Sequence, residues 1–263
     1  MAYTKEEFKQ LVDDIQSQSW YKNPIGFGIA KVDRGQINKD KILQATFPLI
    51  NWNENFGSAA VLLNALKVAG VDVDTSKSEL VCKISDEFLT SCIEAFRPFI
   101  PEAKGDAHKN VQVISTLASL PIDSGLSADD YRVVFIFEDV TPESTEAVYL
   151  KLYALSTGKA ALRSLNLTGA FGKLHNCAWV GNQPIELDWL RANEIVLKLS
   201  GKYPNIDMVD KFPRFLQHII PADNTRILET SKVRMGAQLA AGTTVMPGAA
   251  YVNFNAGTLG AVM

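Results

Sequence analysis

Residues 226–252 read RILETSKVRMGAQLAAGTTVMPGAAYV, and this stretch decides the fold of the C-terminal part of the chain. An apolar residue recurs in it at every sixth position, and a glycine recurs at the same interval. Neither the period of an α-helix nor that of a strand produces such a repeat. A hexapeptide β-helix does, because each short strand points one aliphatic residue inward and small residues turn the corner. The apolar positions are Ile227, Val233, Leu239, Val245 and Tyr251, and the glycines are Gly236, Gly242 and Gly248.

Residues 1–221 show no such repeat and predict a mixed α/β domain. We therefore expect an α/β N-terminal domain over 1–221, followed over 222–263 by the first coils of a left-handed parallel β-helix. Residues 163–200 do not divide clearly between strand and helix. The other expected elements are a helix after a Thr4–Glu7 capping box, a strand over 25–32, a helix over 56–69, a helix from a Ser76–Glu79 capping box to Ala95, a strand over 133–137 and a helix with Thr141 as N-cap.

Composition excludes several classes of protein. The 263 residues carry a formal net charge of -3, which excludes a nucleic-acid binder that uses a broad basic face. Residues 235–263 contain no charged side chain, but Gln238, Pro247 and Asn253 make them too polar and too broken for a helix in lipid. No signal peptide is recognisable, and three cysteines outside any CxxC pair are typical of a reducing compartment. A cytoplasmic protein that binds neither membrane nor nucleic acid is expected.

Two familiar kinds of site are not predicted. Gly26-Phe27-Gly28 matches half of a dinucleotide fingerprint, but Lys31 occupies the third glycine position, so these glycines are interpreted as strand residues. The histidines at 108, 175 and 218 are far apart and lie outside the repeat, which counts against a zinc site. His218 is interpreted as a packing or hydrogen-bonding residue and not as a base.

Two other segments concentrate polar groups. VDKFPR (209–214), followed by Arg226, Lys232 and Arg234, gathers cations near the domain junction. Guanidinium groups there suit a dicarboxylate substrate, although a solvated surface has the same composition. YVNFNAGT (251–258) interrupts the repeat with two amides and a hydroxyl, which indicates either a binding site or asparagines that satisfy turn backbone.

Five segments carry a family resemblance, namely VRMGAQLAAGTTVMPG (233–248), YVNFNAGTLG (251–260), VDKFPR (209–214), NLTGAFG (166–172) and FGIAKVDRG (27–35). They closely resemble the tetrahydrodipicolinate N-succinyltransferase family in its longer N-terminal form, over almost the whole chain. The resemblance implies a homotrimer with active sites between neighbouring subunits. It also implies the succinyl-CoA-dependent step of lysine and diaminopimelate biosynthesis, in which the amine of ring-opened tetrahydrodipicolinate (2-amino-6-oxopimelate) attacks the thioester.

The resemblance assigns substrate binding to six positions and a metal to none. The positions are Arg234, Asn253, Asn255 and Thr258, with Lys211 and Arg214 as weaker candidates. Some members bind magnesium through acidic residues, but the corresponding positions here are Ser231 and Pro247-Gly248, which argues against the metal. Succinyl-CoA is expected as the cosubstrate.

The sequence departs from the family at its end. In the family, Gly-Thr-Leu-Gly continues into Val-Glu-Gly-Arg, whose glutamate is the catalytic carboxylate, and this chain ends at Met263 before that segment. We therefore expect the front part of a longer protein, inactive by itself, and assign no catalytic residue. Two alternatives are an acyltransferase of the same fold that uses acetyl-CoA and a non-catalytic module that assembles or caps β-helix trimers.

Overall fold

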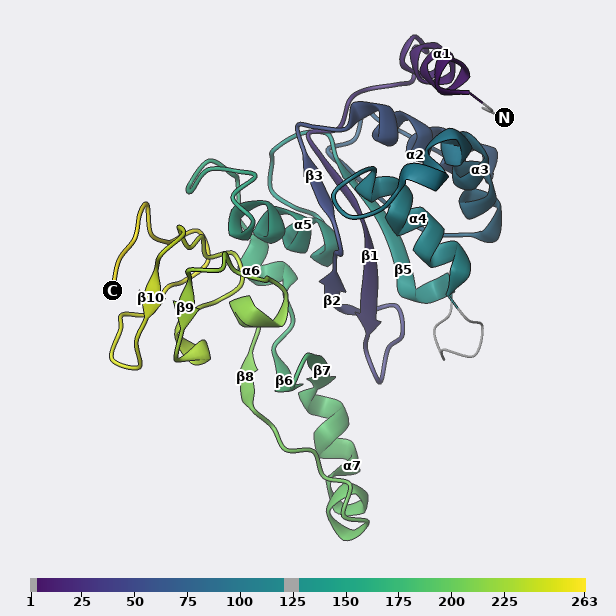
Figure 1. Cartoon of the computed structure of the whole chain (residues 1–263). Coiled ribbons are helices and arrows are strands. Elements are labelled where there is room, and N and C mark those ends of the chain that lie inside the picture. Colours follow the sequence, from purple (N-terminus) through teal and green to yellow (C-terminus); the bar gives the residue numbers. More distant parts are fainter. Residues whose placement is uncertain (1–3, 121–127) are drawn as a thin grey trace. The chain divides into compact units, whose positions relative to one another are not determined.

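The computed structural model of the chain describes residues 4–120 and 128–263. It divides into two units, one containing residues 1–31 and 47–139 and the other containing residues 32–46 and 140–263 (Figure 1). The predicted boundary between 221 and 222 falls inside the second unit and stays a prediction. In the described residues, no helix has the length and apolar character needed to cross a membrane.

The first unit packs helices against an antiparallel sheet. Strand β5 (Tyr131–Ile136) lies between β1 (Gly26–Arg34) and β4 (Glu79–Lys83), and β3 (Ile50–Trp52) pairs with β1. The helices are α1 (Lys5–Gln16), α2 (Phe56–Val68), α3 (Asp86–Phe96) and α4 (Lys109–Ser119), with a 3-10 turn at Arg97–Glu102 and another at Ala128–Asp130. Their apolar faces and the sheet enclose one core, which includes Phe27, Leu66, Phe88, Phe96 and Phe135.

A buried helix organises the second unit. All residues of α5 (Thr145–Ser156) are buried, and the helix packs against β2 (Ile42–Thr46), the strand next to β1 in the strand order. A helix enclosed on every side needs a partner for each charge. Lys151, in its middle, accordingly donates to the carbonyl oxygens of Val140 at 2.6 Å and Asn166 at 2.8 Å.

An arm formed by residues 177–210 projects from the rest of the second unit (Figure 1). Its three antiparallel strands are β7 (Gln183–Glu186), β6 (Cys177–Val180) and β8 (Met208–Asp210), with β6 in the middle. Helix α7 (Leu187–Leu199) follows β7 and buries one residue, Leu190. The region left undivided from sequence, 163–200, therefore contains the short helix α6 (Ala170–Lys173), two strands and α7.

The C-terminal residues form stacked coils with short parallel contacts. Strands β9 (Arg226–Ile227) and β10 (Thr244–Val245) pair in parallel, with Arg226 opposite Thr244, eighteen positions later. Further along, Val233 pairs with Val252 and Gln238 with Gly257, nineteen positions apart. Three hexads make one coil of eighteen residues, so a single extra residue enters between Val245 and Val252. Short 3-10 turns at Phe215–Gln217 and Thr230–Lys232 complete the elements.

Because of the extra residue, the prediction that Tyr251 is an inward-pointing position of the repeat is wrong. Val233 and Val245 are buried as expected, but Tyr251 is 44% exposed and Val252 takes the position opposite Val233. The aromatic side chain instead meets Arg214, whose Nη1 donates to the Tyr251 hydroxyl at 2.9 Å.

Two predicted helix starts are also wrong. Residues 79–83 form strand β4, because pairing with β5 satisfies their backbone, and the helix begins after Ser85, whose hydroxyl accepts from the Phe88 N–H. Helix α5 begins after Ser144 and not Thr141, because the Ser144 hydroxyl accepts from the Ala147 N–H at 3.0 Å and so forms the N-cap. The Thr4–Glu7 capping box, the strand at 25–32 and the helix from Phe56 are confirmed.

The glycines at 26 and 28 are strand residues, as predicted. A Cβ at Gly26 would lie 2.5 Å from the Trp52 ring, and one at Gly28 would lie 2.8 Å from the Leu49 carbonyl oxygen. Both positions therefore need glycine so that β3 can pair closely with β1.

Candidate functional site

Two of the predicted arginines meet at a carboxylate at the end of β8. Backbone pairing of residues 213–215 with 233–235 brings them together, with Phe215 N–H donating to the Val233 carbonyl and Met235 N–H to the Pro213 carbonyl, both at 3.0 Å. Arg234 then binds Asp210 in two places, with Nε to Oδ2 at 3.1 Å and Nη2 to Oδ1 at 2.9 Å. This bidentate pair fixes the plane of the Arg234 guanidinium.

Aromatic rings and an amide hold the same guanidinium. The Arg234 Cζ lies 5.2 Å from the centroid of Phe212 and 5.5 Å from that of Tyr251. Its Nη1 donates to Asn253 Oδ1 at 3.1 Å. The donors of Arg234 are thus largely used inside the protein.

Arg214 is placed differently, because it lines an open hollow of about 360 Å³. Its Nη1 lies 3.6 Å from Asp210 Oδ2 in addition to the Tyr251 contact. The hollow is also lined by Thr230, Ser231 and Asn182, which supply two hydroxyls and an amide. The lining also includes Asp207, whose carboxylate accepts from the Gly181 N–H at 2.7 Å, and the Ser231 hydroxyl donates to Glu229. The Arg214 guanidinium is therefore the group in this hollow that is suited to recognising a carboxylate.

The other three predicted residues lie apart from this cluster. Lys211 Nζ donates to the Phe171 carbonyl at 2.9 Å and lies over the Phe171 ring. Asn255, with a left-handed φ of 56°, accepts from the Arg163 N–H at 2.7 Å. Thr258 accepts from the Ala240 N–H at 2.9 Å and shares a 2.6 Å hydrogen bond with Thr243. Asn255 and Thr258 thus satisfy backbone groups, which was the alternative interpretation of their segment.

Sequence reasoning missed Asp210 and Tyr251 as members of the cluster. Asp210 also accepts from the Lys211 N–H at 2.7 Å, and its side chain is only 11% exposed. The sequence did contain a signal for Asp210, since it is the one acid in the VDKFPR segment and lies four residues before Arg214. Tyr251 carried no such signal because the repeat placed it in the coil interior.

His218 is half-buried, and both of its ring nitrogens are hydrogen-bonded. The Gln44 amide Nε2 donates to Asp33 Oδ2 at 2.6 Å and to the Asn182 carbonyl at 3.0 Å, which leaves its Oε1 facing His218 Nε2 at 2.9 Å. Nε2 therefore carries the proton, and the Tyr153 hydroxyl donates to Nδ1 at 2.8 Å. Burial lowers the pKa of His218 to about 3. The interpretation of His218 as a hydrogen-bonding residue is confirmed.

The cysteines are free thiols. Burial raises the pKa of Cys82 and of Cys177 to about 11, and it also raises the pKa of Cys92. A thiol with a raised pKa is a poor nucleophile near neutral pH. These residues therefore do not suit covalent catalysis.

The residues at the family's magnesium position do not fit that ion. The Ser231 hydroxyl donates to Glu229 Oε1 at 2.7 Å, and Pro247 and Gly248 have no side-chain oxygen. Among residues 4–120 and 128–263, no three His, Cys, Asp or Glu side chains are grouped to hold a metal. We derive no step through a metal ion.

Comparison with known proteins identifies the family. The model of the tetrahydrodipicolinate N-succinyltransferase N-terminal domain matches residues 6–172, and the model of the middle domain matches residues 174–214. The chain belongs to the tetrahydrodipicolinate N-succinyltransferase family. The resemblance stated from the sequence segments is thereby confirmed.

Curated family members share high identity with this chain. 2,3,4,5-Tetrahydropyridine-2,6-dicarboxylate N-succinyltransferase of Sulfurovum sp. is 65% identical over 98% of this chain and 64% of its own length. The enzyme of the same name from Nitratiruptor sp. is 64% identical over 100% of this chain and 66% of its own length. A crystal structure from Campylobacter jejuni, described as a 2,3,4,5-tetrahydropyridine-2-carboxylate N-succinyltransferase, superimposes with a TM-score of 0.92 at 55% identity, covering 99% of this chain and 66% of that one. The chain thus spans about two thirds of these relatives.

Proposed function

We propose that the protein containing this chain is an acyltransferase that moves a succinyl group from succinyl-CoA to the amine of ring-opened tetrahydrodipicolinate. The observation that carries the proposal is the 65% identity to a curated N-succinyltransferase over 98% of the chain. In the reaction, the amine nitrogen attacks the thioester carbonyl, a C–N bond forms, the C–S bond breaks and coenzyme A leaves as a thiol. A base takes the ammonium proton, and donors stabilise the developing oxyanion. We assign the base to no residue of this chain.

Within this reaction, Arg214 is the group that we expect to bind a substrate carboxylate. It borders an open hollow, whereas the guanidinium of Arg234 is engaged by Asp210 and Asn253. Arg234 and Asn253 then hold the Asp210 cluster in place. Asn255 and Thr258 support the coils, and Lys211 supports the segment that carries Arg214.

We also propose that residues 222–263 begin a left-handed parallel β-helix after an N-terminal α/β domain over 1–221, in a homotrimer in the cytoplasm. Parallel pairing at eighteen- and nineteen-residue intervals supports the β-helix, since three hexads make one coil. Apolar side chains exposed on the coils, including Leu228 and Met246, support burial against further subunits. The free thiols are compatible with a reducing compartment.

The test uses the complete native protein, purified from its own cells, and follows thiol release from succinyl-CoA and from acetyl-CoA with the amine substrate present. We expect amine-dependent release from succinyl-CoA at least tenfold faster. Arg214→Met is expected to raise KM for the amine substrate about tenfold, and the exposed Arg191→Met on α7 serves as the control of equal charge change.

Other outcomes would replace the proposal. Equal or faster release from acetyl-CoA would favour the alternative acyltransferase. A trimer that releases no thiol from either donor would favour the non-catalytic assembly module. An unchanged KM in Arg214→Met would contradict the role of that residue.

A further inference from the structure

The hollow beside Arg214 is lined by two segments that lie far apart in the sequence. One is the turn Gly181-Asn182, which joins β6 to β7, and the other carries Arg214 and Gln217. The position of the Arg214 guanidinium in the hollow therefore depends on what connects these two segments.

The side chain of Gln217 makes this connection. Its Oε1 accepts from the Arg214 N–H at 2.5 Å, and its Nε2 donates to the Gly181 carbonyl at 2.5 Å. Gly181 lies 36 positions before Gln217, so the two polar atoms of one amide bind two separate segments. An amide suits this role because it carries a donor and an acceptor on one planar group.

The turn that Gln217 reaches is itself held in place. Asp207 Oδ2 accepts from the Gly181 N–H at 2.7 Å, and Nε2 of the buried Gln44 donates to the Asn182 carbonyl at 3.0 Å. Gly181 has a left-handed φ of 55°, which glycine adopts without strain. Gln217 is therefore bound to a turn whose backbone is already fixed by two other side chains.

A local explanation accounts for only half of this arrangement. Gln217 ends the 3-10 turn that follows Arg214, and its bond to the Arg214 N–H caps the start of that turn. A cap of this kind needs no bond to Gly181. Pairing of the Arg214 segment with the coils also leaves the Gly181 turn unattached to it. The bond from Gln217 to Gly181 therefore supplies a connection that neither the cap nor the coil pairing provides.

From this geometry we propose that Gln217 is a positioning residue, which holds Arg214 at the distance from the Gly181-Asn182 turn at which its guanidinium binds a substrate carboxylate. The proposal rests on the carboxylate-binding role proposed above for Arg214. Both polar atoms of Gln217 are used inside the protein, so it acts through Arg214 and not on the reacting atoms. Its loss should therefore weaken binding of the amine substrate and leave the chemical step unchanged.

The test compares Gln217→Leu with the parent in the complete native protein, by the rate of thiol release from succinyl-CoA. We expect KM for the amine substrate to rise about fivefold, while kcat and KM for succinyl-CoA stay within about twofold of the parent. A merely structural role would instead lower kcat and change both KM values. An unchanged KM for the amine substrate contradicts the proposal.

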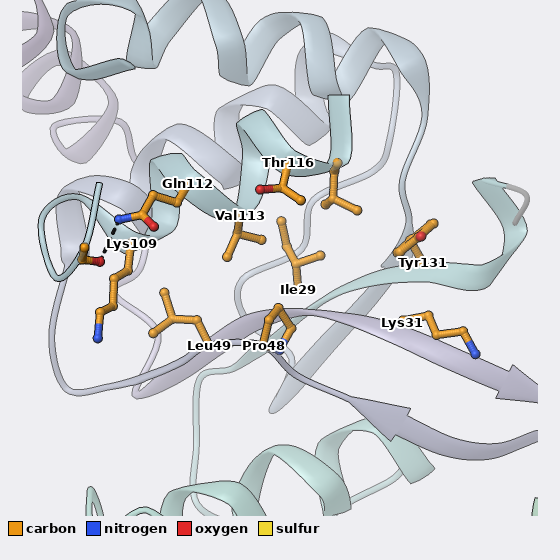
Figure 2. Close-up of a pocket in the computed structure, with 11 residues that line it drawn as sticks. Ile29, Lys31, Pro48, Leu49, Lys109, Gln112, Val113, Thr116 and Tyr131 are labelled. Atoms are coloured by element: carbon orange, nitrogen blue, oxygen red, sulfur yellow. Dashed lines mark hydrogen bonds between the residues drawn. The ribbon is translucent and has the colours of Figure 1, made fainter. Parts of the chain in front are cut away.

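Gln112 on α4 provides the matched control. Its Nε2 also donates to carbonyls of a turn, those of Gly105 at 3.0 Å and Ala107 at 2.7 Å (Figure 2 shows the first). It belongs to the first unit and is not among the described residues that line the hollow. Gln112→Leu should therefore leave kcat and both KM values unchanged. A rise in KM for the amine substrate equal to that in Gln217→Leu would show that any loosened turn has this effect, against the proposal.

Two further variants test whether Gln217 acts through Arg214 and through Gly181. Gln217→Leu combined with Arg214→Met should raise KM no more than Arg214→Met alone, because the group that Gln217 positions is then absent. Additive increases would contradict the proposal. Gln217→Glu keeps an oxygen for the Arg214 N–H but lacks a donor for the Gly181 carbonyl, so its KM should also rise. A KM equal to that of the parent would show that the cap is sufficient, which also contradicts the proposal.

A binding measurement distinguishes this proposal from the proposed function. Heptanedioate has the carbon chain and both carboxylates of the amine substrate but no amine to accept an acyl group. In calorimetric titration of the complete protein, Gln217→Leu should weaken heptanedioate binding about fivefold, and Gln112→Leu should leave it unchanged.

The combined outcomes assign each failure to one proposal. If no thiol is released but Gln217→Leu weakens heptanedioate binding as expected, the transferase function is wrong and the role of Gln217 stands. If thiol is released but neither KM nor heptanedioate binding changes in Gln217→Leu, the role of Gln217 alone is wrong. A parent protein that neither releases thiol nor binds heptanedioate would overturn both.

Discussion

Asp210 is the acceptor on which both arginines of the cluster depend. Asp210→Asn removes the charge that faces Arg234 and Arg214 while keeping the size of the side chain. Since the carboxylate is 11% exposed, we expect a loss of about 1–3 kcal/mol in the free energy of unfolding, measured in urea.

The exposed pair on α7 provides the control for this change. Asp188 lies 2.5 Å from Arg191 Nη1, but its side chain is 81% exposed. We expect Asp188→Asn to stay within about 0.5 kcal/mol of the parent chain. Equal losses in the two variants would show that Asp210 is an ordinary surface charge.

His218 should make stability depend on pH. The folded pKa of about 3 is below the usual 6.5, so the unfolded chain binds more protons between these values. The contribution of neutral His218 is complete above pH 6.5 and decreases as pH falls toward 3. The difference in urea midpoint between pH 7.5 and 5 should therefore be smaller in His218→Gln than in the parent.

A histidine in the first unit supplies the comparison for the pH experiment. His108 is partly exposed and lies 3.6 Å from Glu102. His108→Gln should therefore keep the decrease in urea midpoint between pH 7.5 and 5 that His218→Gln reduces. Identical pH profiles for the parent and His218→Gln would contradict a neutral His218.

At the scale of elements, the structure places the N-cap of α3 at Ser85, whereas the sequence pattern predicted the helix start at Ser76. The Ser85 hydroxyl accepts from the Phe88 N–H at 3.2 Å, whereas the Ser76 hydroxyl donates to Asp74 at 2.6 Å outside any helix. Ser85→Ala should cost about 1 kcal/mol in urea denaturation because α3 loses its N-cap. Ser76→Ala should cost less than half as much. A larger loss of stability in Ser76→Ala than in Ser85→Ala would support the helix start predicted at Ser76.

The coil stack depends on one glycine for close backbone approach. A Cβ at Gly257 would overlap the Gln238 carbonyl oxygen, across the parallel contact between these two residues. Gly257→Ala should therefore destabilise the coils by about 1–3 kcal/mol, measured by amide hydrogen exchange at residues 238–258. Gly260, where a Cβ would meet no atom within 4 Å, is the control. Equal protection in Gly257→Ala and Gly260→Ala would contradict this packing.

At the scale of the whole molecule, α7 presents apolar residues that nothing in the second unit covers. Ile195, Val196 and Leu199 are exposed, Leu199 by 85%, and they lie on one side of the projecting helix. We expect Ile195→Ser with Leu199→Ser to reduce concentration-dependent association, measured by sedimentation, without lowering the melting temperature by more than a few degrees.

An isolated exposed valine in the first unit tests whether association depends specifically on the apolar side of α7. Val68, the last residue of α2, is 64% exposed. Val68→Ser should leave association unchanged. Association that persists in the α7 variant would show that another surface joins the copies.

The sequence by itself determined the features encoded within a few residues. The six-residue repeat predicted a coil stack, the Thr4–Glu7 box predicted the start of α1, and the family segments led to the right family. Caps and periodicities depend on neighbours in the chain, so no knowledge of the packing is needed.

Only the tertiary structure decided which polar groups meet. Gln44 reaches His218 across 174 positions, and Asp210 reaches Arg234 because strand pairing brings their segments together. Pairing with β5 likewise makes residues 79–83 a strand, against the helix signal at Ser76. Contacts between distant residues depend on how whole elements pack, and that packing is a property of the folded chain and of no single segment.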